Sequence, residues 1–303
     1  MKQRISIICT IVMMVLLVFG CGPKQLGTTG ATHQVTDGTG TVVTVPSEPK
    51  RVVPIAASTE DIVLSLVDPS RVAAVGTVPN NVPDASAKVE KHVKASAESM
   101  LSVQPDLVLV PNWMSPDAIG EMRNMQIPVY VYKTPTTVKE AKATIHEIAG
   151  LLHASDESMI ASMDADLKTV EELANKHSGE RPLVAFYSQF GLTGGKGSTF
   201  DDMCNYLKVN NAAAQIGLGP FDNGTREDLI KSNPDIIFIP SVAYTSDGTT
   251  PATAEQLYSD SALQGVKAIA NRRVYLVDSS QVMSYSQFMT RAMVSMAQNI
   301  YSM

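Results

Sequence analysis

The 303-residue sequence is short of several residue types on which common protein functions depend. It has only three cysteines, which cannot form a dense disulfide framework, and none has the Cys-x-x-Cys spacing of zinc or redox sites. Lysine and arginine number 24 against 30 aspartates and glutamates, so the net charge is −6. Proteins that bind nucleic acids need a basic face to contact phosphates. The composition therefore argues against a nucleic-acid partner.

The motifs of common enzyme sites are also missing. There is no Gly-x-Ser-x-Gly nucleophile elbow, which an exported α/β hydrolase would need. Residues 191–198 resemble a phosphate-binding loop, but the spacing is one residue short and Gly197 follows Lys196 where serine or threonine is required. A turn near a cleft is the better interpretation of this segment. We expect no catalytic residues and no enzyme activity, with an exported α/β enzyme as the alternative.

The one long apolar run is at the amino terminus. A basic start precedes apolar residues 5–19, which Gly20 and Cys21 follow, and this pattern is typical of a secretory signal. The run is shorter than the roughly 20 residues that a membrane-spanning helix needs. Residues 17–21 resemble a bacterial lipobox, which implies that residues 1–20 are removed and that Cys21 carries membrane lipid. The chain would then sit at the extracytoplasmic face of the cell membrane. An ordinary signal peptide is the alternative.

After an expected flexible tether at residues 21–33, the pattern predicts an α/β lobe over residues 34–154. The tether is rich in glycine and threonine and has no periodicity. Short β-branched runs then alternate with helical patterns, which indicates a parallel sheet covered by helices. The predicted strands are 52–56, 72–75, 107–110 and 129–132, and the predicted helices are 58–66, 95–103, 116–124 and 137–152.

A second lobe is predicted over residues 179–303. Between the lobes, residues 155–178 form a helical pattern that contains neither glycine nor proline. The strand pattern then restarts at 183–187, 236–239 and 274–277, and a closing helix covers about 286–301. Cys204 lies among apolar residues at helical spacing, so we interpret it as a buried apolar residue.

The two predicted lobes contain an internal repeat. Residues 96–111 align with residues 225–240 without a gap, and in both segments a glutamate lies seven residues before Pro-Asp. These glutamates are Glu98 and Glu227. The repeat predicts two lobes of similar plan.

The order of these elements resembles that of the substrate-binding proteins of ABC importers, in the class that binds cobalamin, siderophores and haem. Residues 49–53, the helix at 137–152 and the two glutamate units carry the resemblance, which covers nearly all of residues 34–303. It implies two Rossmann-like lobes joined by a single long rigid helix, with the ligand cleft between them. It also implies an ABC permease with its ATPase as partner, docked through Glu98 and Glu227. Alternatively, both acids only complement a helix dipole.

The ligand cleft is expected beyond the carboxyl ends of the strands, where α/β sheets bind ligands. The loops expected there carry aromatic and amide side chains suited to a flat macrocycle or chelate. For each aromatic residue, the alternative is a packing role in the core. The candidate ligand contacts are Asn80, Asn112, Trp113, Tyr187, Phe190, Phe221, Tyr244 and Tyr285.

The charge of these loops favours one class of ligand. They contain no arginine and no histidine, which favours a neutral corrinoid, or a ferric hydroxamate siderophore, over an anionic catecholate. The alternatives are an importer component that binds haem, with Tyr244 or Tyr285 as the iron ligand, and one that binds a free metal ion. The five histidines lie in the tether, in polar segments or on helices, and we expect them at the surface and not around a bare metal ion. We therefore expect no resident cofactor or metal, and a small-molecule metal chelate as the transported ligand.

Overall fold

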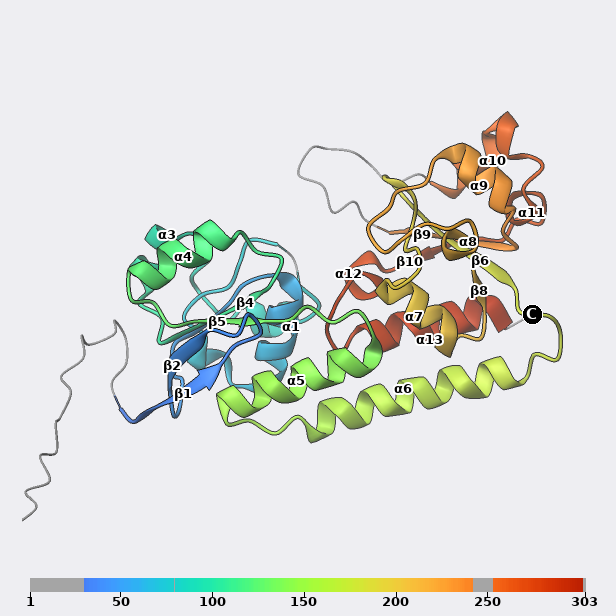
Figure 1. The fold of residues 1–303 in the computed structure, drawn as a ribbon. Coiled ribbons are helices and arrows are strands. Elements are labelled where there is room, and N and C mark those ends of the chain that lie inside the picture. The colour runs from blue at the N-terminus through green and yellow to red at the C-terminus, as the bar shows by residue number, and fades with distance from the viewer. Residues whose placement is uncertain (1–29, 79, 242–252, 302–303) are drawn as a thin grey trace, which may run out of the picture.

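The computed structural model describes residues 30–78, 80–241 and 253–301. Two α/β lobes lie side by side along a pair of long helices, α5 (Val138–Leu152) and α6 (Glu157–Asn175) (Figure 1). The parallel sheets of the two lobes confirm the predicted fold class. α6 covers most of the range where the sequence predicts a connecting helix.

The amino-terminal lobe has a parallel sheet in the order β3-β4-β5 and a separate antiparallel hairpin, β1-β2. The strands are β1 (Thr32–Thr36), β2 (Val42–Pro46), β3 (Val52–Pro54), β4 (Leu107–Pro111) and β5 (Val129–Tyr132). Besides α5, the helices are α1 (Ala57–Leu66), α2 (Pro83–Ser86), α3 (Ala97–Val103) and α4 (Pro116–Asn124), with a 3₁₀ turn at Pro69–Arg71. Successive β4 side chains enter different core clusters because they point to opposite faces of the sheet.

The strand predicted at residues 72–75 is wrong. Val72 forms a single parallel bridge with Val52, and Val75 forms one with His92. The backbone nitrogen of Ala73 donates to the carbonyl of Val52 at 2.8 Å. The next bond in this parallel pattern requires a proton on the nitrogen of Pro54, which has none, so the ladder ends after one bridge.

The carboxyl-terminal lobe has a five-stranded sheet. Its order is β10-β9-β6-β7, with β8 also paired to β6, and only the β6–β7 pairing is antiparallel. The strands are β6 (Leu183–Ser188), β7 (Gly191–Thr193), β8 (Asn210–Asn211), β9 (Ile236–Pro240) and β10 (Val274–Val277). The helices are α7 (Thr199–Tyr206), α8 (Ala212–Gln215), α9 (Arg226–Ser232), α10 (Ala254–Ser259), α11 (Lys267–Ala270), α12 (Ser279–Val282) and α13 (Met289–Tyr301), with a 3₁₀ turn at Ser261–Leu263.

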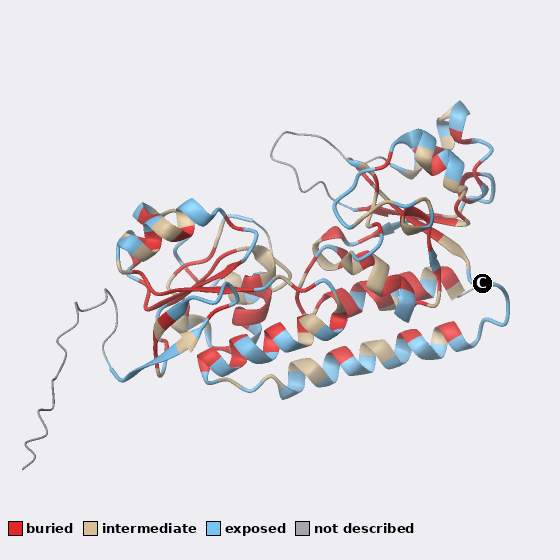
Figure 2. Ribbon diagram, in the orientation of Figure 1, coloured by how far each residue is buried: buried red, intermediate tan, exposed pale blue. Residues whose placement is uncertain are grey.

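One apolar core runs through both lobes. Leu152 of α5, Met163 of α6 and Met296 of α13 belong to the same buried cluster, each with no exposed surface. Figure 2 shows buried positions spaced along α5 and α13, while the outer side of α6 is exposed. Because close-packed cores resist deformation, this shared core holds the lobes to the two long helices.

The sequence repeat corresponds to a repeated helix-to-strand unit. Ser96 and Thr225 cap α3 and α9, and their side chains accept backbone N–H groups at 3.3 and 3.2 Å. Both helices end on a residue in the left-handed region, Gln104 at φ 46° and Asn233 at φ 50°. A left-handed residue is a common helix terminator.

The two Pro-Asp units anchor a neighbouring strand. The Asp106 carboxylate accepts the backbone N–H groups of Lys50 and Arg51, at 2.7 and 2.9 Å, just before β3. The Asp235 carboxylate accepts the N–H of Leu183 at the start of β6, at 2.8 Å. The repeated aspartates therefore hold equivalent strands in place in the two lobes.

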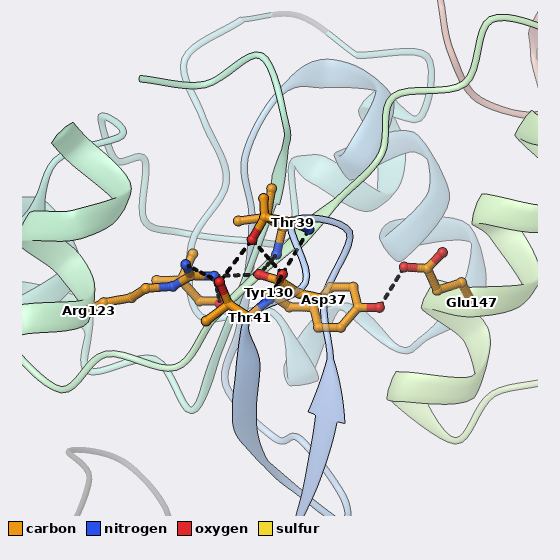
Figure 3. Close-up of polar contacts among 8 residues, drawn as sticks. Asp37, Thr39, Thr41, Arg123, Tyr130 and Glu147 are labelled. Carbon is orange, nitrogen blue, oxygen red and sulfur yellow. Dashed lines mark hydrogen bonds and ion pairs between the residues drawn. The ribbon is translucent and has the colours of Figure 1, made fainter. Parts of the chain in front are cut away.

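A buried carboxylate fixes the amino-terminal hairpin (Figure 3). Asp37 accepts the Thr39 N–H and hydroxyl at 2.9 and 2.6 Å and the Thr41 N–H at 3.0 Å, and it pairs with Arg123. Burial alone would raise the pKa of Asp37, but these bonds together lower it. β1 begins at Thr32, so the last residues of the expected tether belong to a strand.

Candidate functional site

A cavity of about 280 Å³ opens on the carboxyl-terminal lobe. Its wall comes from β6, β7, the start of α7 and the segments 220–223 and 282–285, and Thr136 adds to it from the segment that joins β5 to α5. Asp222 is its only lining residue with a formal charge at neutral pH. Apolar walls with a few polar groups are typical of small-molecule sites.

The glycine-rich segment forms one side of this cavity, and the prediction of a turn near a cleft is confirmed. Gly194, Gly197 and Ser198 line the cavity. A Cβ atom at Gly195 would lie 2.3 Å from the carbonyl oxygen of Leu218, so the close approach of these two segments requires glycine.

This turn is no phosphate cradle. The N–H groups of Lys196, Gly197 and Ser198 donate to Leu218 O, the Asp201 carboxylate and Gly195 O, at 2.8, 2.9 and 3.1 Å. A phosphate-binding loop needs these backbone donors to point at its ligand. Here the turn only shapes the wall.

Aromatic side chains surround the mouth and the floor of the cavity. Phe190 is 51% exposed and Phe221 is 90% exposed, although both line the cavity. Phe186 and Phe200 pack beneath them with ring centroids 5.5 Å apart. Tyr285 also lines the cavity, and burial raises the pKa of its phenol, so the phenol is neutral at neutral pH. A ligand that covered the exposed rings would remove apolar surface from water.

The candidate residues of the amino-terminal lobe do not line this cavity. The Asn80 amide donates to the buried Glu60 carboxylate at 2.6 Å and faces a separate recess beside His92. The Asn112 side chain accepts the N–H of Thr134 at 3.0 Å. Trp113 follows β4 and is 62% exposed. The structure thus groups Phe190, Phe221 and Tyr285 and leaves these three apart.

Tyr187, another candidate ligand contact, does not line this cavity either. Phe186 and Ser188 line it, and Tyr187 between them points to the other face of β6, where it packs on a different apolar cluster. Because side chains alternate along a strand, the sequence pattern alone places Tyr187 on the opposite face of β6 from Phe186 and Ser188. Tyr244 and Cys21 lie outside the described residues.

Sequence reasoning missed several cavity residues. Phe186 and Ser188 share the face of β6 that the alternation defines, so this signal was available. Thr136 and Val282 are 146 residues apart in the sequence, and nothing local in the sequence brings them together.

Glu98 and Glu227 occupy equivalent places. Both are exposed and lie in the first turns of α3 and α9. Figure 1 shows α3 and α9 on the side of their lobes that faces away from α5 and α6. Neither glutamate forms an ion pair with another described residue.

The described residues contain no group of three or more histidine, cysteine, aspartate or glutamate side chains that could hold a metal ion. All five histidines are exposed, as predicted. Cys204 is 2% exposed, which confirms the buried interpretation, and burial raises the pKa of its thiol. Among the helices of the described ranges, none is long and apolar enough to cross a membrane.

Comparisons with known proteins agree with this architecture. A model of the family "Periplasmic binding protein" matches residues 52–281. An uncharacterized ABC transporter substrate-binding lipoprotein of Bacillus subtilis is 27% identical, with 99% of this chain and 98% of that protein covered. A cobalamin-binding protein of Halobacterium salinarum is 23% identical over 86% of this chain and 72% of its own length.

A solved structure shares the fold. The periplasmic heme-binding protein RhuT from Roseiflexus superimposes with a TM-score of 0.70 and 20% identity, covering 84% of this chain and 98% of that chain. At this identity, the match shows a common fold and nothing about a common ligand.

Proposed function

Because the chain belongs to the periplasmic binding protein family, we propose that it is the extracytoplasmic substrate-binding component of an ABC importer and that it captures a metal chelate. A corrinoid such as cobalamin is the favoured ligand, and a ferric hydroxamate siderophore is the next. The similar proteins bear the names of binding and transport components. A chelate of this kind is cargo, so the protein needs no resident cofactor.

The observation that carries this proposal is the chemistry of the cavity. Its lining is aromatic, aliphatic and hydroxyl-bearing, with one carboxylate and no cation. A neutral, flat macrocycle matches such a surface, because aromatic rings bury large areas against it and a neutral ligand brings no charge that needs a cationic or anionic partner. The cavity of about 280 Å³ admits one part of such a ligand. The exposed rings of Phe190 and Phe221 are available to cover more of it.

The experiment is a titration of tryptophan emission with cyanocobalamin, a ferric trihydroxamate and haem in turn. Trp113 is the only tryptophan, and it is exposed. If Trp113 lies beside the bound chelate, a coloured ligand quenches its emission strongly, and Trp113→Ala weakens binding by roughly 1–3 kcal/mol. Tight binding measured by calorimetry without quenching would place Trp113 outside the ligand site. No binding of any of the three would contradict the proposal.

Haem is the alternative ligand, and one observation favours it. Tyr285 lines the cavity and could supply a phenolic oxygen to iron. If haem binds in this way, Tyr285→Phe abolishes the absorption bands of tyrosinate-ligated iron. An unchanged haem spectrum in Tyr285→Phe would exclude this residue as the ligand.

We propose further that Glu98 and Glu227 dock the protein on arginines of the permease, which works with its ATPase. Two exposed anions on separate lobes fix an orientation through charge complementarity and charge-assisted hydrogen bonds. Their common position in two repeated helices on the same side of the molecule supports this role.

The docking role is tested by measuring ligand affinity and transporter-dependent uptake together. Glu98→Ala with Glu227→Ala should abolish uptake and leave affinity intact, and each single variant should be partly defective. Glu157→Ala with Glu171→Ala is the matched control, because both are exposed glutamates on α6. Normal uptake in the first double variant would end the docking role.

A further inference from the structure

Two carboxylates of α1 are completely buried and have no part in the cavity described above. Glu60 and Asp61 each have no exposed surface. Asp61 accepts two hydrogen bonds from Asn81, one from its backbone N–H at 2.6 Å and one from its side-chain amide at 2.8 Å. These bonds fix the loop before α2 to α1 within the amino-terminal lobe.

Asp61 and Asn81 also form hydrogen bonds with residues of the carboxyl-terminal lobe. The Ser286 hydroxyl donates to the Asp61 carboxylate at 3.1 Å, and the Ser284 hydroxyl is bonded to that of Ser286. The Asn81 amide also donates to the carbonyl of Ser280 at 2.9 Å. The Gln287 amide donates to the backbone carbonyl of Asp61 at 3.0 Å. These partners lie about 200 residues away, in α12 and in the segment between α12 and α13.

No cation lies among the partners of Asp61, whose neighbouring acid is Glu60. Burial raises the pKa of Asp61, and the bonds from Asn81 and the serines act against that rise. An unpaired buried carboxylate is unfavourable for folding, because its desolvation is only partly offset by neutral donors. A cluster of this kind adds little to stability, but it defines one geometry through several directional bonds.

The segment that Asp61 holds is also a wall of the cavity. Met283 and Tyr285 line the cavity, whereas Ser284 and Ser286 between and beyond them face Asp61. One side of the segment 283–286 therefore lines the cavity, and its other side forms the contact between the lobes. The hydrogen bonds to Asp61 therefore act on the same segment that carries Tyr285.

We propose that Asp61, Asn81 and Ser286 form an interlobe clasp that sets the distance between the lobes and the position of the Tyr285 wall. These are positioning residues, since none of them lines the cavity. The clasp adds a second connection to the one that α6 provides. The effect on ligand binding rests on the proposed function, but the effect on the distance between lobes does not.

The test measures the distance between lobes without any ligand. Spin labels at Ser102→Cys on α3 and Lys231→Cys on α9 report it by double electron–electron resonance, since both positions are exposed. The mature chain carries Cys21→Ala for this purpose, and Cys204 is too buried to react. The distance distribution should be narrow in the parent chain and shifted or broadened in Asp61→Asn.

Asp37→Asn is the matched control. Asp37 is likewise a buried aspartate of the amino-terminal lobe that accepts several hydrogen bonds, but its partners all lie within that lobe (Figure 3). The Asp37→Asn variant should leave the distance distribution unchanged even if the substitution lowers thermal stability. If Asp61→Asn does not fold, Ser284→Ala with Ser286→Ala removes the cross-lobe hydroxyls and decides the question. A distribution that matches the parent in the folded variant would overturn the clasp.

A second readout tests the ligand wall with cyanocobalamin as probe. Asp61→Asn should weaken its binding at least about tenfold, the equivalent of one hydrogen bond to a charged group. Asp37→Asn should bind as the parent does. A broadened distance distribution in Asp61→Asn, with no binding of cyanocobalamin to the parent chain, would support the clasp and contradict the corrinoid ligand. Unchanged affinity in Asp61→Asn, beside a parent that binds, would overturn the link between clasp and wall.

Discussion

Phe221→Ala should weaken chelate binding strongly and leave folding nearly unchanged. The ring lines the cavity mouth and is 90% exposed, so little of its area is used in folding. A ligand resting on one ring face covers roughly 80 Å², which at about 25 cal/mol per Å² contributes about 2 kcal/mol. The dissociation constant should therefore rise about 30-fold. Loss of an exposed side chain should change unfolding free energy by less than about 0.5 kcal/mol.

The assay is isothermal calorimetry with cyanocobalamin, paired with thermal unfolding of the same samples. Leu276→Ala is the control, because Leu276 is an apolar residue with 63% exposure that does not line the cavity. It should change neither affinity nor stability. If Phe221→Ala binds the chelate as tightly as the parent, the ring is not part of the ligand site and the reasoning from exposed rim to ligand contact fails.

Three further predictions concern the backbone, the hairpin and the anchor. Ala56 has φ 86° and ψ 144°, a backbone conformation that is unfavourable for a residue with a Cβ. Ala56→Gly should raise the unfolding free energy by about 1 kcal/mol, because relief of about 1–3 kcal/mol of strain exceeds the entropy cost of glycine. An unchanged midpoint of thermal unfolding would contradict this prediction. The folded-state pKa of Asp37 is lowered, so its contribution is present above its ordinary pKa and is lost as the pH falls through the folded value. As the pH falls below about 4, the unfolding free energy measured with denaturant should therefore decrease more in the parent chain than in Asp37→Asn. Parallel pH profiles of the two proteins would contradict this prediction. Cys21→Ala should release the protein from the membrane fraction or block its processing, whereas normal cleavage with unchanged membrane association would refute the lipid anchor.

The alternation of strands and helices predicted most of the fold. The strands at 107–110, 129–132, 236–239 and 274–277 lie where the apolar runs placed them, to within a residue. One element, the β1–β2 hairpin, depended on less visible features. It begins in a stretch of glycine and threonine that has no strand pattern, and the Asp37 carboxylate beside it pairs with Arg123, which is 86 residues away in the sequence.

The site was predicted less completely than the fold. Phe190, Phe221 and Tyr285 were chosen as candidates because loop aromatics are unusual in a chain with so few of them, and all three line one cavity. Tyr187 lies away from this cavity because the direction of a strand side chain depends on the pleat and not on nearness to a loop. The contacts of Asp61 with Ser286 join residues 225 positions apart, and only the packed lobes bring them together.

The central claim is capture of a metal chelate, and one absorption spectrum tests it most directly. Protein made of residues 22–303 is incubated with equimolar cyanocobalamin, ferric trihydroxamate and haem, desalted, and its visible spectrum is recorded. We expect the bands of the corrinoid, or else of the ferric hydroxamate, to remain with the protein at about one ligand per chain, the stoichiometry that one ligand cavity allows. A colourless protein after this competition, with its folding verified by circular dichroism, would contradict the account.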